Sequence, residues 1–308
     1  MSFVRILRDF ARQSRMLFLT CTVVPVAFGG AVAYSHTGRF DWPLFLLTLL
    51  GVSIAHVGVN LSNDFFDFAS GADRHDEDRP YSGGGDAIVR DGVPPESVKR
   101  WFWICFAAAL AIGIVILVWI PAGHLEVMAV MVLGFLGGYF YTAPPLRLAY
   151  RGLGELDIFV FLGPAPVIGT YAVQTGRITW EAIVLSLPIA GLIALLLWIN
   201  QYTDFESDKL AGKNNLVVRL GKKKARWGYM LLNIFVYAAV VYAVVKAVVE
   251  PSFLIVLIAL PLAWRSTRNA FEGYDDPQRV RAAQADALMM HLMAGLLCSA
   301  GVLIGTLI

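Results

Sequence analysis

The chain has 308 residues, of which 57% are hydrophobic and 16% are charged, and its mean hydropathy is +0.64. This composition is typical of a polytopic membrane protein and excludes a soluble globular domain. The formal net charge is only +2, and the basic residues are spread over several short segments without a recognition motif, which argues against nucleic acid as a partner.

The first residues, 1–13, alternate apolar and basic side chains at near-helical spacing and predict a helix that lies in the membrane interface. The apolar run that follows is longer than the core of a signal peptide and contains Pro25, which favours a transmembrane helix over a cleaved signal. We count nine apolar stretches, each close to the roughly 20 residues that a spanning helix needs. They lie near 16–36, 42–62, 101–121, 124–142, 156–175, 180–202, 227–248, 251–265 and 286–308.

Lys and Arg residues gather in alternate connections between these stretches. If the N-terminus is cytoplasmic, only Arg39, Arg177 and Lys246 of the 25 basic residues lie on the outer side. The positive-inside rule then predicts a cytoplasmic N-terminus, an external C-terminus and an odd number of spans. The protein is expected in the cell inner membrane, with the connections 67–100 and 203–226 as cytoplasmic loops that cover one end of the helices.

The second apolar stretch ends in a cluster of amides and carboxylates. Asn63 and Asp67 are i,i+4 neighbours, so they share one face of a helix, and Asp73 follows in the loop. Asp64 points about 100° away from Asn63 and is expected either to bind a second ion or to hold the other ligands in place.

The sixth apolar stretch ends in a similar cluster, which makes a weak internal repeat. Asn200, Asp204 and Asp208 follow one another at i,i+4 spacing. Mg²⁺ prefers carboxylate and water oxygens and is commonly held by one or two carboxylates together with substrate phosphates. The sequence therefore predicts that the two clusters face each other and hold a diphosphate through bridging Mg²⁺ ions. Its expected ligands are Asn63, Asp64, Asp67, Asp73, Asn200, Asp204 and Asp208.

Both connections carry residues suited to phosphate. In the first, Arg79 precedes Gly83–Gly85, whose backbone N–H groups can approach a phosphate, although such a run is more often only a flexible connection. In the second, Lys209, Lys213 and Arg219 follow the Asp pair closely and are expected to neutralise a diphosphate. The alternative is positive-inside charge alone, which accounts for the neighbouring lysines 222–224.

These motifs carry a family resemblance. The sequence Asn63-Asp64-x-x-Asp67, the pair Asp204-x₃-Asp208 with the loop that runs on to Gly221, and the stretch 139–155 are similar to those of the UbiA superfamily of intramembrane prenyltransferases. The form of the first motif and the stretch 139–155 are closest to the menaquinone-pathway branch, which prenylates 1,4-dihydroxy-2-naphthoate. The resemblance implies one all-α domain over 1–308, with nine transmembrane helices around a central cavity.

The resemblance also implies a reaction. Asp67, Asp204 and Asp208 with Mg²⁺ would hold a polyprenyl diphosphate while its C–O bond ionises. An aromatic acceptor would then attack the allylic cation and lose its carboxylate as CO₂, giving a demethylmenaquinone. The rings of Tyr139 and Tyr141 are candidates to stabilise that cation.

Three further residues are candidates to bind the acceptor. Glu155, Asp157 and Arg147 lie in or just after the shared stretch 139–155, and the two carboxylates come at the start of the fifth span. Carboxylates at a helix start also simply favour the positive end of the helix dipole, so this alternative stays open for Glu155 and Asp157.

Two other functions remain open from the residues alone. The same superfamily chemistry can serve another acceptor, namely 4-hydroxybenzoate, homogentisate, a chlorophyllide or a glycerol phosphate lipid. A cation-coupled transporter would also carry acidic residues on membrane helices, but its sites usually lie near the bilayer midplane at broken helices. Both acidic clusters here fall at one membrane face beside basic loops, which favours the enzyme. The oligomeric state is not predicted.

Overall fold

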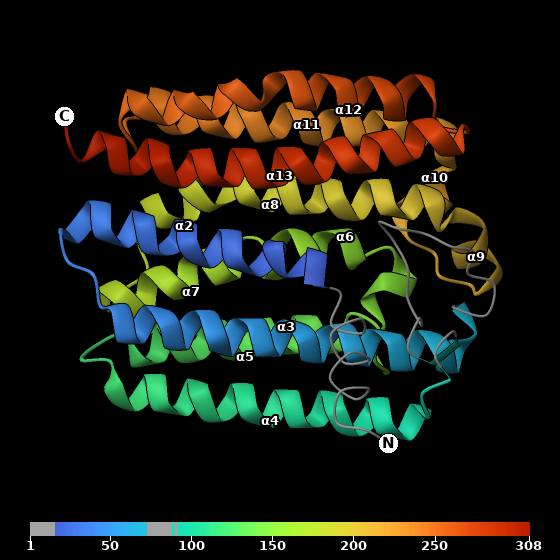
Figure 1. Cartoon of the computed structure of the whole chain (residues 1–308), viewed down its shortest axis with the longest axis horizontal. Helices are drawn as coiled ribbons and strands as arrows, with labels where there is room; N and C mark the ends of the chain where they lie inside the picture. The colour runs from blue at the N-terminus through green and yellow to red at the C-terminus, as the bar shows by residue number, and fades with distance from the viewer. Residues whose placement is uncertain (1–15, 73–87, 90–91) are drawn as a thin grey trace.

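The structure of the protein is a computed structural model that describes residues 16–72, 88–89 and 92–308. These residues form helices and connections without a strand, which confirms the all-α prediction for the described part of the chain. The predicted interfacial helix 1–13 and the loop residues Asp73 and Arg79 lie outside the described residues. The long helices run side by side along the longest axis of the molecule (Figure 1).

The long helices overlap the predicted apolar stretches, although some extend well beyond them. The first half of the chain contains α2 (Thr20–Thr37), α3 (Trp42–Ser70), α4 (Pro95–Trp119), α5 (His124–Phe140), α6 (Gly154–Asp157) and α7 (Pro164–Thr175). The second half contains α8 (Trp180–Thr203), α9 (Phe205–Leu210), α10 (Leu216–Leu220), α11 (Lys222–Val245), α12 (Leu260–Glu272) and α13 (Pro277–Gly305). Short 3-10 and π segments at Leu148–Arg151, Ile158–Leu162 and Pro251–Ala259 join some of them.

The predicted count of nine spans is not confirmed. Within the described residues, 6 helical segments are long and apolar enough to cross a membrane. The first predicted span, α2, falls short because it ends in the polar run Tyr34–Thr37, and α5 has only 17 residues. The eighth forms a 3-10 segment of 9 residues that runs into α12, an amphipathic helix of mixed apolar and polar residues. The protein is a multi-pass membrane protein, and the number of its spans stays a prediction.

The ends of α3 place the first cluster. The Asp41 side chain accepts a hydrogen bond from Leu44 N, and a proline follows at the first turn, so the helix begins there. The helix ends at Gly71, whose φ of +84° suits glycine and whose N–H bonds to the carbonyls of Asp67 and Phe68. Asp67 therefore lies in the last turn of an uninterrupted helix of 29 residues.

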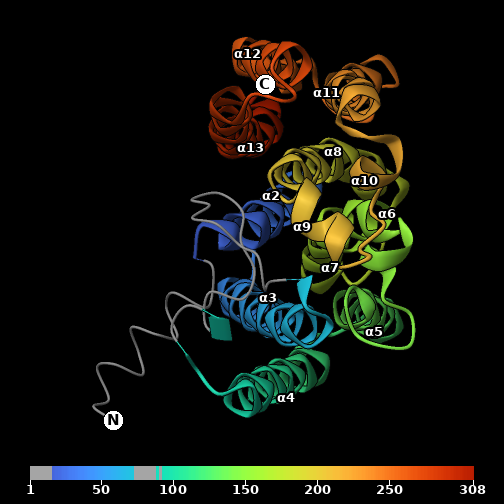
Figure 2. The ribbon, with the colours of Figure 1, turned by 90° about the vertical axis from the view of Figure 1, so that its right-hand side faces the viewer.

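The second cluster lies where α8 passes into α9. Asp204 separates the two helices, yet Asp204 N still bonds to Asn200 O (3.2 Å) and Asp208 N to Asp204 O (2.8 Å). The predicted i,i+4 spacing is thus retained through the junction. Figures 1 and 2 show α9, α10 and the end of α3 at the same end of the bundle, so both clusters face one side.

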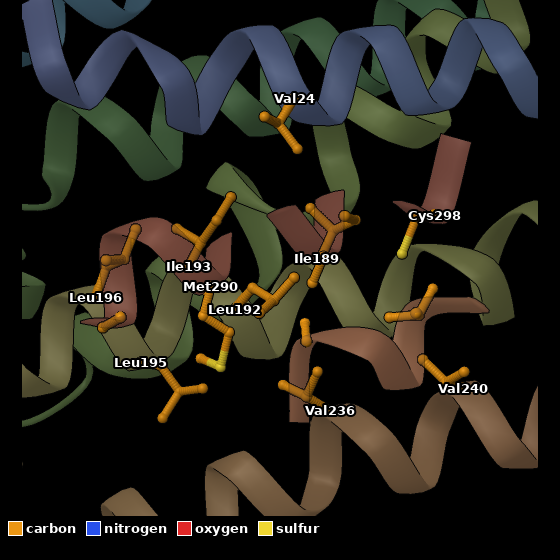
Figure 3. Packing of buried hydrophobic residues seen from close by; sticks show 14 of the residues in the cluster. Val24, Ile189, Leu192, Ile193, Leu195, Leu196, Val236, Val240, Met290 and Cys298 are labelled. Carbon is orange, nitrogen blue, oxygen red and sulfur yellow. The ribbon is translucent and has the colours of Figure 1, made fainter. Parts of the chain in front are cut away.

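The core is built around α8, which is the most completely buried of the candidate spans. It contacts α2, α7, α11 and α13, and Figure 2 shows it between the groups that these helices form. Figure 3 shows Leu192 and Ile193 of α8 packed among Val236 of α11 and Met290 of α13. A rigid central helix of this kind fixes the position of the second cluster at its end.

Candidate active site

The two predicted clusters meet at Lys213. Its ammonium lies 3.1 Å from Asp67 Oδ2 and 3.8 Å from Asp208 Oδ1. Both carboxylates are 6% exposed, so the contact is shielded from solvent. One cation therefore joins the carboxylate at the end of α3 to the carboxylate of α9.

The other oxygen of Asp67 is held by a residue that the sequence did not single out. The Tyr150 hydroxyl donates to Asp67 Oδ1 at 2.6 Å and lies 2.5 Å from the Ser70 hydroxyl. Tyr150 belongs to the stretch 139–155 that carries the family resemblance, which is the only signal for it in the sequence. Its hydrogen bond to Asp67 joins two segments whose contact cannot be predicted from residue spacing.

Asp208 is held in a comparable way by a second unpredicted residue. Asn215 Nδ2 donates to Asp208 Oδ2 at 2.6 Å, while Asn215 Oδ1 accepts from Val218 N at 2.9 Å and so caps α10. The backbone N–H of Lys213 also bonds to the carbonyl of Asp208 at 2.8 Å. The loop between α9 and α10 is thereby folded around the Asp208 carboxylate.

Asn215→Leu is expected to destabilise the protein by about 2 kcal/mol, because it removes a helix cap and the donor to a buried carboxylate. The measurement is the unfolding temperature of the purified protein in detergent, compared with Asn215→Asp. Asp keeps the capping oxygen but loses the donor to Asp208, so its loss should be smaller at acidic pH, where a carboxyl can be protonated. An Asn215→Leu protein that unfolds at the wild-type temperature would contradict this assignment.

The charges of this cluster are not fully balanced. Burial, opposed by Lys213 and assisted by Asp204 and Asp67, raises the pKa of Asp208 to about 7. Burial also works against the charged form of Lys213, but Asp67 and Asp208 outweigh it and raise the pKa of the ammonium well above its usual value. Lys213 is therefore a permanent cation, and a further positive charge would stabilise Asp208 as a carboxylate.

The two amides of the motifs have partners from other helices. Thr142 Oγ1 donates to Asn63 Oδ1 at 2.7 Å. Gln284 Nε2, on α13, donates to Asn200 Oδ1 at 2.9 Å and reaches Thr203 Oγ1 at 3.2 Å. Each amide oxygen is thus fixed by a side chain outside its own motif.

Two further predicted metal ligands, Asp64 and Asp204, lie on or next to the helices that carry the two clusters. Asp64 is buried within α3, and Asp204 is half-buried at the α8 to α9 junction. Asp204 is near enough to Asp208 to act on its charge.

Of the basic residues predicted to bind diphosphate in the second loop, Lys213 reaches the carboxylates. Arg219 instead donates from Nε to Asn214 O (2.8 Å) and from Nη2 to Arg151 O (2.5 Å). Lys209 is exposed, with its ammonium 6.0 Å from the centre of the Phe205 ring. Arg219 therefore joins the loop after α9 to the connection that carries Tyr150.

The two candidate tyrosines lie in different surroundings. Tyr141 is buried beside Tyr150 and Ala149, and Lys213, Glu155 and Asp67 all act on its hydroxyl electrostatically. Tyr139 packs in an aromatic cluster between α3, α4 and α5, with ring centres 5.8 Å from Trp103 and 6.0 Å from Phe135. The structure brings Tyr141 to the carboxylate cluster and gives Tyr139 aromatic neighbours.

Of the predicted acceptor residues, Glu155 and Asp157 are buried and Arg147 is half-buried, and each has a different direct neighbour. Glu155 Oε1 accepts from Gln201 Nε2 (2.8 Å) and from Leu216 N (2.7 Å), which ties α6 to α8 and α10. Asp157 faces α5 instead, since a Cβ built on Gly137 would lie 3.0 Å from Asp157 Oδ1. The Arg147 guanidinium lies over the Tyr150 ring, 3.8 Å from its centre.

Comparison with known proteins places this arrangement in a class. The model of the UbiA prenyltransferase family matches residues 22–304. The chain is 30% identical to a 1,4-dihydroxy-2-naphthoate octaprenyltransferase of Haemophilus influenzae, over 97% of each chain. It is 29% identical to a 2-carboxy-1,4-naphthoquinone phytyltransferase of Synechocystis sp., over 92% of this chain and 89% of the relative.

A solved structure shares the fold. A UbiA homolog from Archaeoglobus fulgidus, bound to DMAPP and Mg²⁺, superposes with a TM-score of 0.65 at 16% identity, over 94% of this chain and 99% of that one. Fold and site together define a multi-pass membrane enzyme with two facing acidic motifs. The chain belongs to the UbiA prenyltransferase family and is a prenyltransferase.

Proposed function

We propose that the enzyme transfers a polyprenyl group from an allylic diphosphate to 1,4-dihydroxy-2-naphthoate, with Mg²⁺, at the cytoplasmic face of the inner membrane. The observation that carries this proposal is the contact of one ammonium, Lys213, with carboxylates from both motifs, Asp67 and Asp208. The name of the Haemophilus influenzae relative, a 1,4-dihydroxy-2-naphthoate octaprenyltransferase, supports the acceptor.

The residues present fit a divalent cation. Asp67 and Asp208 offer only oxygen ligands, and they already attract one cation, the Lys213 ammonium. Among the described residues no group of three or more His, Cys, Asp or Glu side chains is placed to hold a metal ion on its own, and a bound diphosphate would supply further oxygen ligands. Mg²⁺ held by Asp67 and Asp208, with help from Asn63 and Asp204, would neutralise the diphosphate as it departs.

Residues of the chain itself would stabilise the leaving group and the allylic cation. Lys213 donates to a diphosphate oxygen and so stabilises the charge that develops on the leaving group. The ring of Tyr141, buried beside this cluster, offers an electron-rich face to the allylic cation. Asp67 and Asp208 are buried, and exclusion of water around them would protect the allylic cation from capture by water.

The reaction then balances as a substitution on the ring. The prenyl C–O bond breaks and its electrons leave with the diphosphate. The ring carbon that bears the carboxylate attacks the prenyl carbon, and CO₂ departs from that ring carbon, returning its bonding electrons to the aromatic system. The product is a 2-prenyl-1,4-naphthoquinol, the reduced form of a demethylmenaquinone.

The test is an assay of the purified protein in detergent with Mg²⁺, a long-chain polyprenyl diphosphate and a panel of acceptors, with products identified by mass. We expect a decarboxylated prenyl product from 1,4-dihydroxy-2-naphthoate, lost on addition of EDTA and restored by excess Mg²⁺. Product from 4-hydroxybenzoate, homogentisate or another panel member only would overturn the acceptor but keep the mechanism. No diphosphate release with any acceptor would overturn both.

A further inference from the structure

We infer that Tyr150 is a positioning residue that fixes which oxygen of Asp67 faces the cations of the site. The inference rests on the proposed function. The Tyr150 hydroxyl donates to Asp67 Oδ1 at 2.6 Å, while Asp67 Oδ2 faces the Lys213 ammonium at 3.1 Å. One oxygen is therefore reserved for a neutral donor, and the other is presented to positive charge.

The Tyr150 ring also joins three separate parts of the chain. The Arg147 guanidinium lies over it at 3.8 Å, and the Lys213 ammonium lies at 5.7 Å from its centre. The Tyr150 carbonyl accepts from Asn214 N at 3.3 Å. The end of α3, the connection before α6 and the loop after α9 thus all contact one residue, Tyr150.

The local backbone holds Tyr150 in this position. It lies in the short 3-10 segment Leu148–Arg151, between Arg147 at φ +46° and Gly152 at φ +70°. A Cβ built on Gly152 would lie 2.7 Å from Arg219 Nε, so only glycine lets the guanidinium cover this turn. The backbone bonds of Arg219 to Asn214 and Arg151 then close the loop against it.

The hydroxyl can only act as a donor to Asp67. The phenol O–H donates across the 2.6 Å to Asp67 Oδ1, because a carboxylate oxygen has no proton to give in return. Partners that orient a ligating carboxylate typically contribute about 10- to 100-fold to metal affinity. Without this donor, the Asp67 carboxylate keeps only the Lys213 contact at Oδ2, so its rotation about the terminal bond is less restricted and Oδ1 is no longer fixed.

The experiment measures binding without turnover. Mn²⁺ binding to the full-length purified protein is followed by electron paramagnetic resonance, with an unreactive farnesyl thiolodiphosphate present. We expect Tyr150→Phe, which keeps the ring, to bind Mn²⁺ about tenfold more weakly than wild type. Tyr150→Leu, which also removes the aromatic face, should in addition bind the thiolodiphosphate more weakly at saturating Mn²⁺.

A matched control separates positioning from loss of a buried hydroxyl. Tyr229, on α11, is fully buried, and its hydroxyl lies 2.5 Å from the Ser266 hydroxyl of α12 rather than against a carboxylate of either motif. Tyr229→Phe deletes a comparable bond and should leave Mn²⁺ affinity at the wild-type value. Equal Mn²⁺ affinity in Tyr150→Phe and wild type would overturn the inference, as would an equal loss in Tyr229→Phe. Failure of the wild-type protein itself to bind Mn²⁺ with the analogue would instead refute the proposed function.

Discussion

Asp67→Asn is expected to abolish prenyl transfer, with kcat/KM lower by on the order of 10³-fold. The substitution keeps the shape of the side chain but removes the charge that attracts Lys213 at 3.1 Å and would hold Mg²⁺. The new side-chain amide can also turn its NH₂ group toward the Lys213 ammonium, and these two donors repel each other. The fold should persist, because α3 is fixed by its cap at Asp41 and by apolar packing rather than by this contact.

The measurement is product formation with saturating diphosphate and acceptor, beside circular dichroism of the same samples. Asp41→Asn on the opposite end of α3 serves as control, since Asn caps a helix about as well as Asp and should leave activity unchanged. Asp208→Asn and Asp204→Asn should behave like Asp67→Asn. Activity within tenfold of wild type in any of the three variants would remove that residue from the site.

Lys213→Met should affect both stability and activity. Removing the ammonium leaves Asp67 and Asp208 close together, buried and without their shared partner. Loss of one member of a buried ion pair commonly costs about 3–5 kcal/mol. Transfer should fall by about 10²-fold or more, because the diphosphate loses a cation that stabilises its departure.

This variant has a signature that a simple folding defect lacks. Its unfolding temperature should be lowest in EDTA and should rise with Mg²⁺ more than that of wild type, because Mg²⁺ replaces the missing positive charge between the carboxylates. Lys223→Met, an exposed lysine on α11, is the control and should match wild type in both buffers. An unfolding temperature in Lys213→Met that does not respond to Mg²⁺ would argue against a metal at these carboxylates.

The sequence predicted those parts of the site that depend on local spacing. Asn63 and Asp67 share a face of α3, and Asn200, Asp204 and Asp208 keep helical spacing, because i,i+4 geometry is a property of the helix alone. Helix ends were less accessible, because α3 and α13 extend past their apolar stretches 42–62 and 286–308, to Ser70 and back to Pro277. The number of spans was harder to predict, because α2 and α5 are short and depend on packing against longer neighbours.

Residue spacing could not predict the contacts between segments that lie far apart in the sequence. Tyr150 is 83 positions from the Asp67 carboxylate that it holds, and only the fold brings the two together, whereas Asn215 reaches Asp208 through the short loop between α9 and α10. Arg219 shows the opposite case, because its position beside the Asp pair suggests a diphosphate contact, while its guanidinium bonds to backbone carbonyls. Glu155 and Asp157, two positions apart, face different helices, as alternate residues of one helical turn must.

The most direct test of the central claim is a structure of the protein with Mn²⁺ and farnesyl thiolodiphosphate, with the metal located by its anomalous scattering. We expect Mn²⁺ bonded to oxygens of both Asp67 and Asp208 and to the diphosphate, with the Lys213 ammonium moved from the carboxylates onto a phosphate oxygen. Metal and diphosphate bound away from these two carboxylates, in a protein that still forms the prenylated product, would contradict the account.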